Sequence, residues 1–360
     1  MNSKRPLVSV VTPFYNTEDY LAECIESVLH QTYDNWEYLL VNNRSTDKSV
    51  QTAEHYVKLY PGKIRLEHNT DFLSQVQNYN HALQLISTKS KYCKLVQADD
   101  WIFPRCLAEM VDTAELDPSI AVVGAYSLEG CNVAFGGLPY PSSVVDGNSV
   151  CRLFFLNSCY IFGSPTQLLL RSDLVLGRTP FYDESYIPFE DTTVIFELLR
   201  HYKFGFVHQV LTFSRRDNNS VMMSLTDLDC NVAFELWMHR DFGHDFLQPD
   251  EYRKHLDRRE RQYCQLLVQN MIRLRGRKFW EFHGSMLKRM GYTLRSAHVW
   301  WLLLGTICDA VLNPKTALSD FVRGLRRLVG KWRNKRTAPS DGAREPLSLR
   351  QEVRGQNVSQ

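Results

Sequence analysis

The sequence predicts an α/β protein built on a parallel sheet, with a helical extension at its C-terminal end. In the first 126 residues, short apolar runs alternate with segments whose apolar residues recur at helical spacing. The links between these segments are short, which is typical of parallel strands joined by right-handed helical crossovers. From about Leu225 the pattern changes to helical segments rich in charge. The whole predicts one α/β domain followed by helices.

Five apolar runs in the first part have the composition of strands that are buried on both faces. Such strands read as nearly continuous apolar stretches, and each run here is followed by a turn or a helical pattern. The expected strands, in chain order, cover residues 7–11, 36–41, 63–68, 92–97 and 120–126.

Helices are expected between these strands because the apolar residues of each intervening segment fall on one face. In residues 17–31 the stripe is Leu21, Ile25, Val28 and Leu29, and Asn16 or Thr17 could cap the helix. In residues 45–60 the inward side chains are Val50, Ala53 and Val57; in the next segment they are Phe72, Val76, Tyr79, Leu83 and Ile86. A fourth helix begins near Pro104, a residue that suits a first helical turn.

The rest of the chain is less regular. Residues 127–147 are rich in Gly, Pro and Ser and predict a loop or an irregular hairpin. Strands are expected in 167–171 and 204–215, with a helix over 191–202. We expect four parts: a first half (1–126) and a second half (127–224) of one domain, a helical region (225–336) and a disordered tail (337–360).

Composition sets limits on the class of protein. Apolar residues make up 44% and charged residues 23% of the 360, which is typical of a globular protein. A formal net charge of +2 argues against a nucleic-acid partner. The nine cysteines include no CxxC pair and indicate buried free thiols in a reducing compartment. The N-terminus has no apolar h-region, so we expect a cytoplasmic protein without a signal peptide.

The C-terminal helical region raises the question of a membrane. Its longest apolar run, 299–312, is interrupted by Asp309 and is shorter than the roughly 20 residues that a spanning helix needs. The segment after it, up to residue 336, places apolar residues on one helical face and arginine and lysine on the rest. Residues 298–336 could therefore bind an anionic membrane surface, or pack as an ordinary helix on the domain or a partner.

Polar residues follow four of the predicted strands at the point where each ends. They occupy residues 12–16, 42–45, 68–71 and 99–101. Because the carboxyl ends of parallel strands meet at one edge of a sheet, one nucleotide-sized crevice could use all four. Asp99 and Asp100 end the fourth strand; two adjacent carboxylates need a partner such as a divalent cation, or a solvated turn.

These pieces resemble the family 2 glycosyltransferases, whose catalytic domain has the A fold with a Rossmann-like, nucleotide-binding sheet. The resemblance covers residues 6–220 and is carried by the ordered set VSVVTPFYN, LLVNNRSTDKS, VQADDW and FEDTT. It implies an inverting transfer from a nucleoside-diphosphate sugar to a hydroxyl of a glycan or lipid-linked acceptor. It also implies that residues 1–126 form the nucleotide-sugar-binding half and residues 127–224 the acceptor-binding half of the catalytic domain. Within the first half, it implies that Pro13, Phe14 and Tyr15 line the base and ribose site, and that Asn78 lies near the nucleotide.

The chain departs from the family pattern at two places. Asn42 and Asn43 stand where the family usually has two acids, and Asn43 corresponds to the acid that accepts a hydrogen bond from the base. An amide can also accept one, so nucleotide binding stays plausible while the choice of base is open. Gln97 replaces the first acid of the Asp-x-Asp motif. Asp99, a nucleotide-binding candidate, and Asp100 remain as candidates to hold Mn²⁺ or Mg²⁺ against the diphosphate.

The resemblance makes Asp191 the candidate general base, which would accept the proton of the acceptor hydroxyl. We expect the helix dipole to favour its carboxylate form and to keep it ionised at neutral pH. An N-cap without chemistry is the alternative. Weaker candidates on the acceptor side are Thr166 in the GSPT segment, Glu190, and Arg216, which with Arg215 belongs to SRRDNNS; each segment could equally be an ordinary loop.

Two other functions remain open on the sequence. A nucleotidyltransferase usually has a glycine-rich, basic loop after its first strand, and TPFYNTED has neither glycine nor a basic residue. A non-catalytic module that binds a sugar nucleotide is supported by Asn42, Asn43 and Gln97, which stand where acids are expected. His208 is expected to be a hydrogen-bonded sheet histidine rather than a ligand.

Overall fold

The computed structural model describes residues 5–157, 160–215 and 228–292, together with Leu304, Cys308 and Val322. These residues form two compact units. The first contains residues 5–157, 160–215 and 242–249, and the second contains residues 228–241 and 250–292. Arg216 and nearly all of the segment 298–336 lie outside the described residues.

The first unit is an α/β structure in which ten strands of the described chain form one sheet. The strands are β1 (Val8–Phe14), β2 (Trp36–Asn42), β3 (Ile64–His68), β4 (Tyr92–Leu95), β5 (Trp101–Ile102), β6 (Ile120–Glu129), β7 (Asn132–Ala134), β8 (Val144–Asp146), β9 (Leu169–Arg171) and β10 (Lys203–Ser214). Their main order is β3-β2-β1-β4-β9-β6-β10-β5, with β7 paired to β6 and β8 to β10.

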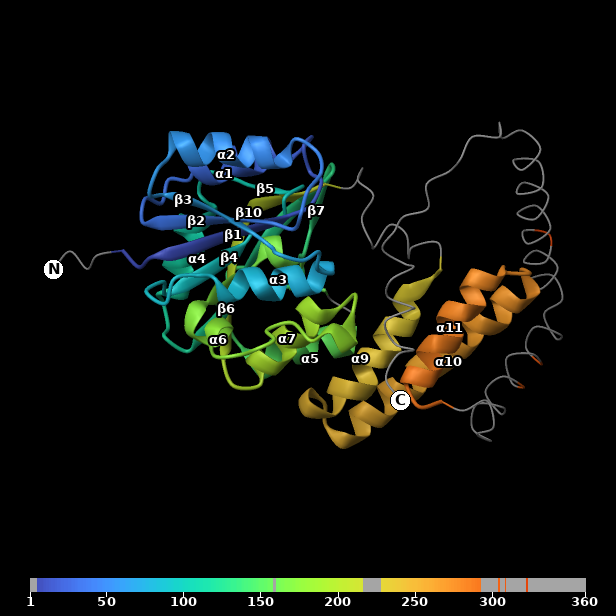
Figure 1. The fold of residues 1–360 in the computed structure, drawn as a ribbon. Helices are drawn as coiled ribbons and strands as arrows, with labels where there is room; N and C mark the ends of the chain where they lie inside the picture. Colours follow the sequence, from blue (N-terminus) through green and yellow to red (C-terminus); the bar gives the residue numbers. More distant parts are fainter. Residues whose placement is uncertain are drawn as a thin grey trace, which may run out of the picture. The chain divides into compact units, whose positions relative to one another are not determined.

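Helices cover both faces of this sheet (Figure 1). Helices α1 and α2 lie over one face, and α3, α6 and α7 lie over the other. The helical elements of the first unit are α1 (Leu21–Leu29), α2 (Ser49–Leu59), α3 (Gln75–Gln84), α4 (Cys106–Ala114), α5 (Gly147–Asn157), α6 (Ser172–Leu176) and α7 (Glu190–Leu199), with the short 3₁₀ turns η1 (Pro165–Gln167) and η2 (Glu184–Tyr186). Helix α9 (Cys230–Phe246) continues the chain.

The predicted strands of the first part are confirmed, with ends that differ by a few residues. Strands β3, β2, β1 and β4 are parallel neighbours, as expected from their apolar runs. Their inward side chains, among them Val8, Val10 and Leu40, join Leu21, Ile25 and Val28 of α1 in one apolar core. The register aligns Phe14 of β1 with Asn42 of β2, and Asn42 with His68 of β3. The carboxyl ends of three strands therefore meet at one edge.

The sheet is not parallel throughout. Strand β9 pairs antiparallel with β4 on one side and with β6 on the other, so it separates the fourth and fifth predicted strands. Residues 127–147, expected as a loop or irregular hairpin, contain β7, which forms a hairpin with β6, and β8. Strand β6 runs to Glu129, past the boundary expected at residue 126.

Two local predictions are wrong. Neither Asn16 nor Thr17 caps α1, whose N-cap is Tyr20 without a side-chain hydrogen bond. Asn16 instead adopts a left-handed conformation, and its side chain accepts a hydrogen bond from the amide of Thr46 at 2.8 Å. Phe72 does not belong to the buried stripe of α3, because that helix begins only at Gln75, capped by Ser74, and leaves Phe72 half exposed.

The second unit consists of helices. Besides the first part of α9 it contains α10 (Pro249–Ile272) and α11 (Arg277–Arg289). Its core is tied by a buried contact between the hydroxyl of Tyr263 and Nδ1 of His283, 2.8 Å apart. Among the described residues, no helix has the length and apolar character that crossing a membrane requires.

Candidate active site

The candidate site lies at the edge where β1, β2, β3 and β4 end. The loops after β1 and β2 are joined there: the amide of Asn16 donates to the hydroxyl of Ser45 at 3.0 Å, and the amide of Thr17 donates to that of Ser49 at 2.8 Å. Asp47 accepts a hydrogen bond from the amide of Glu18. The predicted proximity of these loops is thus present in the structure.

The three candidates of the first strand differ in exposure. Pro13 is buried within β1, and Phe14 belongs to the hydrophobic core, with 2% of its surface exposed. Tyr15 is the one whose ring reaches the surface, at 44% exposure. It contacts the ring of Phe72 edge-on, with 4.8 Å between centroids. Phe72 was missed as a site residue because its apolar character fitted a helical stripe.

Asparagines fill the space between β2, β3 and α3. Asn43 and Asn78 are buried, and Asn69 donates from Nδ2 to the side-chain oxygens of both, at 3.0 and 2.8 Å. Asn42 accepts from the amide of Ser45 and lies 3.0 Å from Nδ1 of His68. Asn78, expected near the nucleotide, is 4% exposed, so its side chain accepts a hydrogen bond from Asn69 and does not line the surface.

Gln97, which stands in the place of an acid, links three segments. Its Nε2 donates to the hydroxyl of Tyr79 at 3.0 Å, and its Oε1 accepts from the hydroxyl of Ser164 at 2.8 Å. Its backbone amide donates to Thr166 Oγ1 at 3.1 Å. Thr166 is fully buried, so this acceptor-side candidate connects β4 to η1 and presents no surface of its own.

Lys94 is a buried residue of this region that the sequence reasoning did not single out. Its side chain is fully buried in β4, and Nζ donates to the carbonyl oxygens of Thr166 at 2.5 Å and Leu168 at 3.1 Å. Burial lowers the pKa of its ammonium group. A lysine within an apolar run was the only available signal.

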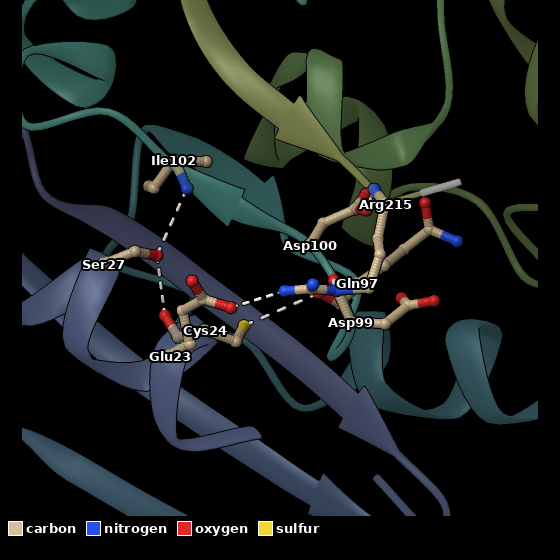
Figure 2. A network of polar contacts seen from close by, with 8 residues as sticks. All are labelled: Glu23, Cys24, Ser27, Gln97, Asp99, Asp100, Ile102 and Arg215. Carbon is tan, nitrogen blue, oxygen red and sulfur yellow. Dashed lines mark hydrogen bonds and ion pairs between the residues drawn. The ribbon is translucent and has the colours of Figure 1, made fainter. Parts of the chain in front are cut away.

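Asp99 and Asp100 point in different directions (Figure 2). Asp100 is 5% exposed and accepts hydrogen bonds from the backbone amide of Arg215, at 3.1 Å, and from the Ser214 hydroxyl, at 3.4 Å. Burial, and next the charge of Asp99, raise the pKa of Asp100 to about 7. Asp99 is half-buried, and its carboxylate turns away from that of Asp100.

Arg215 connects the segment of Asp99 and Asp100 to helix α1. Its Nε donates to the carbonyl oxygen of Asp99 at 3.2 Å, and its Nη2 forms an ion pair with Glu23 of α1 at 2.5 Å (Figure 2). The guanidinium also lies over the ring of Tyr20, 4.7 Å from its centroid. Arg215 thus joins β10, β4 and α1.

The residues present fit a divalent cation only with few protein ligands. Within the described ranges, no group of three or more His, Cys, Asp or Glu side chains comes together as a metal cage. Asp100 accepts hydrogen bonds from Arg215 and Ser214, and Asp99 is the more exposed of the two carboxylates, so both stay candidates to hold a cation. Mg²⁺ is commonly held by one or two carboxylates together with substrate phosphates, so this donor set is compatible with it.

Asp191 lies in the first turn of α7 and is half-buried. Its Oδ1 accepts from the amide of Thr192 at 2.6 Å, and the Thr192 hydroxyl lies 2.9 Å from that of Tyr160. Burial raises the pKa of Asp191 to about 6. Lost hydration is the largest cause of this shift, and the hydrogen bonds from the Thr192 amide and hydroxyl oppose it, so a pKa of about 6 still leaves most of the group ionised at pH 7.

Glu190 is the first residue of α7, next to Asp191, and is half-buried. His208, as expected, is hydrogen-bonded in the sheet, to the hydroxyl of Tyr126 and the carbonyl of Ser142. The described cysteines are free thiols, and most are buried.

Comparison with known proteins gives the same reading of residues 9–161, which match the family model described as glycosyl transferase family 2. The chain is 33% identical over 159 residues to the putative glycosyltransferase EpsE of Bacillus subtilis and 31% identical over 120 residues to the glycosyltransferase GlyG of Streptococcus pneumoniae. These matches cover 42% and 33% of this chain, and 56% and 39% of the two relatives, so the chain spans about half the length of the curated relatives or less.

Two solved structures resemble the chain over most of its length. S. aureus TarS 1-349 in complex with UDP-GlcNAc covers 91% of this chain and 92% of its own, at 16% identity and a TM-score of 0.57. The mannosyltransferase PcManGT of Pyrobaculum calidifontis, in complex with GDP-Man and Mn²⁺, covers 90% and 85%, at 14% identity and a TM-score of 0.52. The fold of the chain is therefore that of these transferases, the A fold.

Proposed function

Residues 9–161 make the chain a member of glycosyltransferase family 2, and on that basis we propose that it transfers a sugar from a nucleoside-diphosphate sugar to a hydroxyl group, with inversion. The acceptor is a glycan or a lipid-linked precursor, and the reaction occurs in the cytoplasm. The observation that carries this proposal is Asp191, a half-buried acid whose pKa of about 6 suits a general base near neutral pH.

The reaction divides among a few side chains. Tyr15, with Phe72, receives the nucleobase on its exposed ring, and Asp99 faces the diphosphate. A divalent ion held by Asp99, when bound, would offset the charge of the departing diphosphate. Asp191 accepts the proton of the acceptor hydroxyl as its oxygen attacks the anomeric carbon and the bond to the diphosphate breaks. A single displacement of this kind inverts the configuration.

Several residues position these groups without taking part in the reaction. Asp100 fixes the turn after β4 through Arg215, and Gln97 joins that turn to Tyr79 and Ser164. Thr166 keeps its place under Gln97, since Lys94 holds its carbonyl oxygen. We assign Glu190 and Arg216 to the acceptor side by the family resemblance alone.

We also propose peripheral contact with an anionic membrane surface, through 298–336 and the turn between α10 and α11. The segment 271–280, which spans the end of α10, the turn after it and the start of α11, exposes Met271, Leu274 and Trp280. It also carries Arg273, Arg277 and Lys278, with no acidic residue among its ten, while its fourth basic residue, Arg275, is paired with Asp229. Apolar side chains with a tryptophan beside basic residues suit the lipid–water interface.

A non-catalytic sugar-nucleotide-binding module is the alternative, and one observation favours it. Three amide side chains stand where acids are expected, and all three form hydrogen bonds within the protein: those of Asn42, Asn43 and Gln97. A screen of UDP-, GDP- and dTDP-sugars with Mn²⁺ and Mg²⁺ separates the two. The transferase releases free nucleoside diphosphate from one donor, whereas the module binds a nucleotide tightly with no release.

A further inference from the structure

Asn43 makes an unusually complete set of contacts for a residue expected to meet a nucleobase. Its Oδ1 accepts hydrogen bonds from Asn69 Nδ2 and from the amide of Leu73, each at 3.0 Å. Its Nδ2 donates to the carbonyl oxygen of Leu73 at 2.9 Å. The side chain is 3% exposed. Asn43 is thus hydrogen-bonded to both the backbone amide and the backbone carbonyl of Leu73, which lies in the loop between β3 and α3.

These contacts fix the orientation of the amide. A flipped side chain would set its oxygen against the carbonyl of Leu73 and its NH₂ against two donors. In the orientation observed, both lone-pair directions of Oδ1 are occupied by N–H groups. The oxygen therefore has no capacity left for the ring N–H of a base, which is the role that the family resemblance gives to the acid at this position.

The loop that Asn43 grips carries one of the two exposed rings of the site. Phe72 directly precedes Leu73, is 50% exposed and meets Tyr15 edge-on. Arg44, in a left-handed conformation, adds a hydrogen bond from Nη1 to the carbonyl of Thr70 at 2.7 Å. The amide of Asn69 donates to the carbonyl of Asn42 at 3.0 Å. The end of β2 thus fixes the loop 69–73 on both sides of Phe72.

We propose that Asn43 is a positioning residue, which holds Phe72 beside Tyr15 so that the two rings form the stacking surface for the base. The base is then recognised by its aromatic face and not by the side chain at position 43. The amide is needed there because an ionised aspartate has no N–H for the Leu73 carbonyl and would repel it. This inference rests on the proposed function, since it names how that donor site takes its base.

The first test uses Asn43→Asp, which restores the acid that the family usually has. Hydrogen exchange of the amides in residues 69–74, followed by mass spectrometry without any ligand, reports on the loop directly. We expect clearly faster exchange there and unchanged exchange in β1 and β4. The matched control is Asn35→Asp, because Asn35 also donates from Nδ2 to a backbone carbonyl, that of Arg5, away from the site.

The second test is a double-mutant cycle on nucleotide affinity, measured by calorimetry with UDP, GDP and dTDP in the presence of Mn²⁺. Phe72→Ala should weaken binding of the preferred nucleotide by about tenfold, the size expected for one lost base–aromatic contact. Asn43→Asp should weaken it by roughly three- to tenfold. In the Phe72→Ala background the same Asp substitution should cost less than about twofold, because its effect passes through the ring.

The outcomes separate this inference from the proposed function. If Asn43→Asp tightens binding, or weakens it equally in the Phe72→Ala background, the side chain at position 43 meets the base and the inference is wrong. Strong binding by the wild type together with unchanged loop exchange in Asn43→Asp also overturns it. If the wild type binds none of the three nucleotides while loop exchange still rises in Asn43→Asp, the proposed donor site is wrong. The assignment of Tyr15 and Phe72 to base stacking is then wrong as well.

Discussion

Two acids of the site, Asp100 and Asp191, have a raised pKa for the same main reason, yet their surroundings give them different roles. Both are removed from water, which disfavours the charged form. Asp100 is occupied by the amide of Arg215 and the hydroxyl of Ser214. Asp191 accepts hydrogen bonds at Oδ1 from the amide of its neighbour Thr192 at 2.6 Å and from the Thr192 hydroxyl at 3.2 Å, which is compatible with accepting a proton from a substrate at its other oxygen.

For Asp191→Asn we expect transfer to fall by at least about a hundredfold, because the general base is lost, while nucleotide affinity changes less than about twofold. In the wild type, kcat/KM should fall about tenfold per pH unit below about pH 6, where Asp191 becomes protonated. Initial rates between pH 5 and 8 measure both. Asp173→Asn, a surface change beside Arg171, is the control, and a full rate in Asp191→Asn would exclude this residue as the base.

Asp100→Asn should stabilise the protein in alkaline solution. The folded pKa of about 7 lies above the ordinary value of 3.8, so the folded state binds more protons between these values and loses stability as pH rises through that window. Asparagine can keep both hydrogen bonds without a charge. We expect a gain of about 1–3 kcal/mol at pH 8 and none near pH 3.5, from urea unfolding. A loss at pH 8 would mean that the ionised carboxylate is better paired than its burial suggests.

At this scale the sequence revealed which residues gather at the site, but not what each contacts. The strand ends brought Tyr15, Asn43 and Asp99 forward, since carboxyl ends of parallel strands share an edge, and the family resemblance brought Asp191 forward. Phe72 and Lys94 were missed because their roles depend on segments distant in sequence or on a helix start three residues later than the apolar pattern implied. No periodicity carries that information.

At the scale of elements, the central feature is the contact between β4 and η1. Lys94 of β4 donates hydrogen bonds to the carbonyl oxygens of Thr166 and Leu168, and Gln97, just after β4, is hydrogen-bonded to Thr166 and Ser164. Gly163, just before η1, has a φ of +73°, and a Cβ there would lie 2.7 Å from Cβ of Gln167. The position of the GSPT segment, residues 163–166, thus depends on both Gly163 and Lys94.

Replacing Lys94 by Met should therefore destabilise the first unit by about 2–4 kcal/mol, since two buried carbonyl groups lose their donor while the apolar stem is kept. Thermal or urea unfolding measures the change. Lys63→Met is a matched control, because Lys63 donates to a single carbonyl, that of Asp34, at the surface, and should cost under about 0.5 kcal/mol. Equal stability of Lys94→Met and wild type would contradict the contact.

The elements themselves were predicted better than their pairing. Continuous apolar runs identified β1, β2, β3, β4 and β6, because strands buried on both faces leave that trace. The run 167–171 predicted a strand, but nothing in the sequence placed that strand, β9, between β4 and β6. Three residues, Leu169–Arg171, pair antiparallel between two strands whose partner residues lie about fifty and about eighty positions earlier, and only the surrounding packing selects that place.

At the scale of the molecule, the proposed membrane contact can be tested through the segment 271–280 of the second unit. Met271→Ser/Leu274→Ser/Trp280→Ser should weaken co-sedimentation with vesicles of phosphatidylcholine and phosphatidylglycerol, because it removes exposed apolar side chains and leaves 298–336 unchanged. The wild type should not bind pure phosphatidylcholine, and added salt should weaken its binding to anionic vesicles.

The control for that experiment is Leu116→Ser, a change at a residue of the first unit that is 63% exposed. Binding of the triple variant equal to that of the wild type would exclude the turn. Binding by neither protein would remove the membrane from the proposed function while leaving the sugar transfer untouched.

Strand β9 also has a consequence for how the polypeptide matures on the ribosome. Until Leu169–Arg171 has been synthesised, β4 has an open edge on one side and β6 lacks the neighbour that joins it to β1, β2 and β3. A nascent chain stalled after β6 would thus expose unpaired strands to other chains, a known route to aggregation. The strand that joins β4 to β6 is thus made only after residue 168, and β10, which pairs with β6, β5 and β8, follows at Lys203–Ser214, so chaperone protection is needed until both strands have been made.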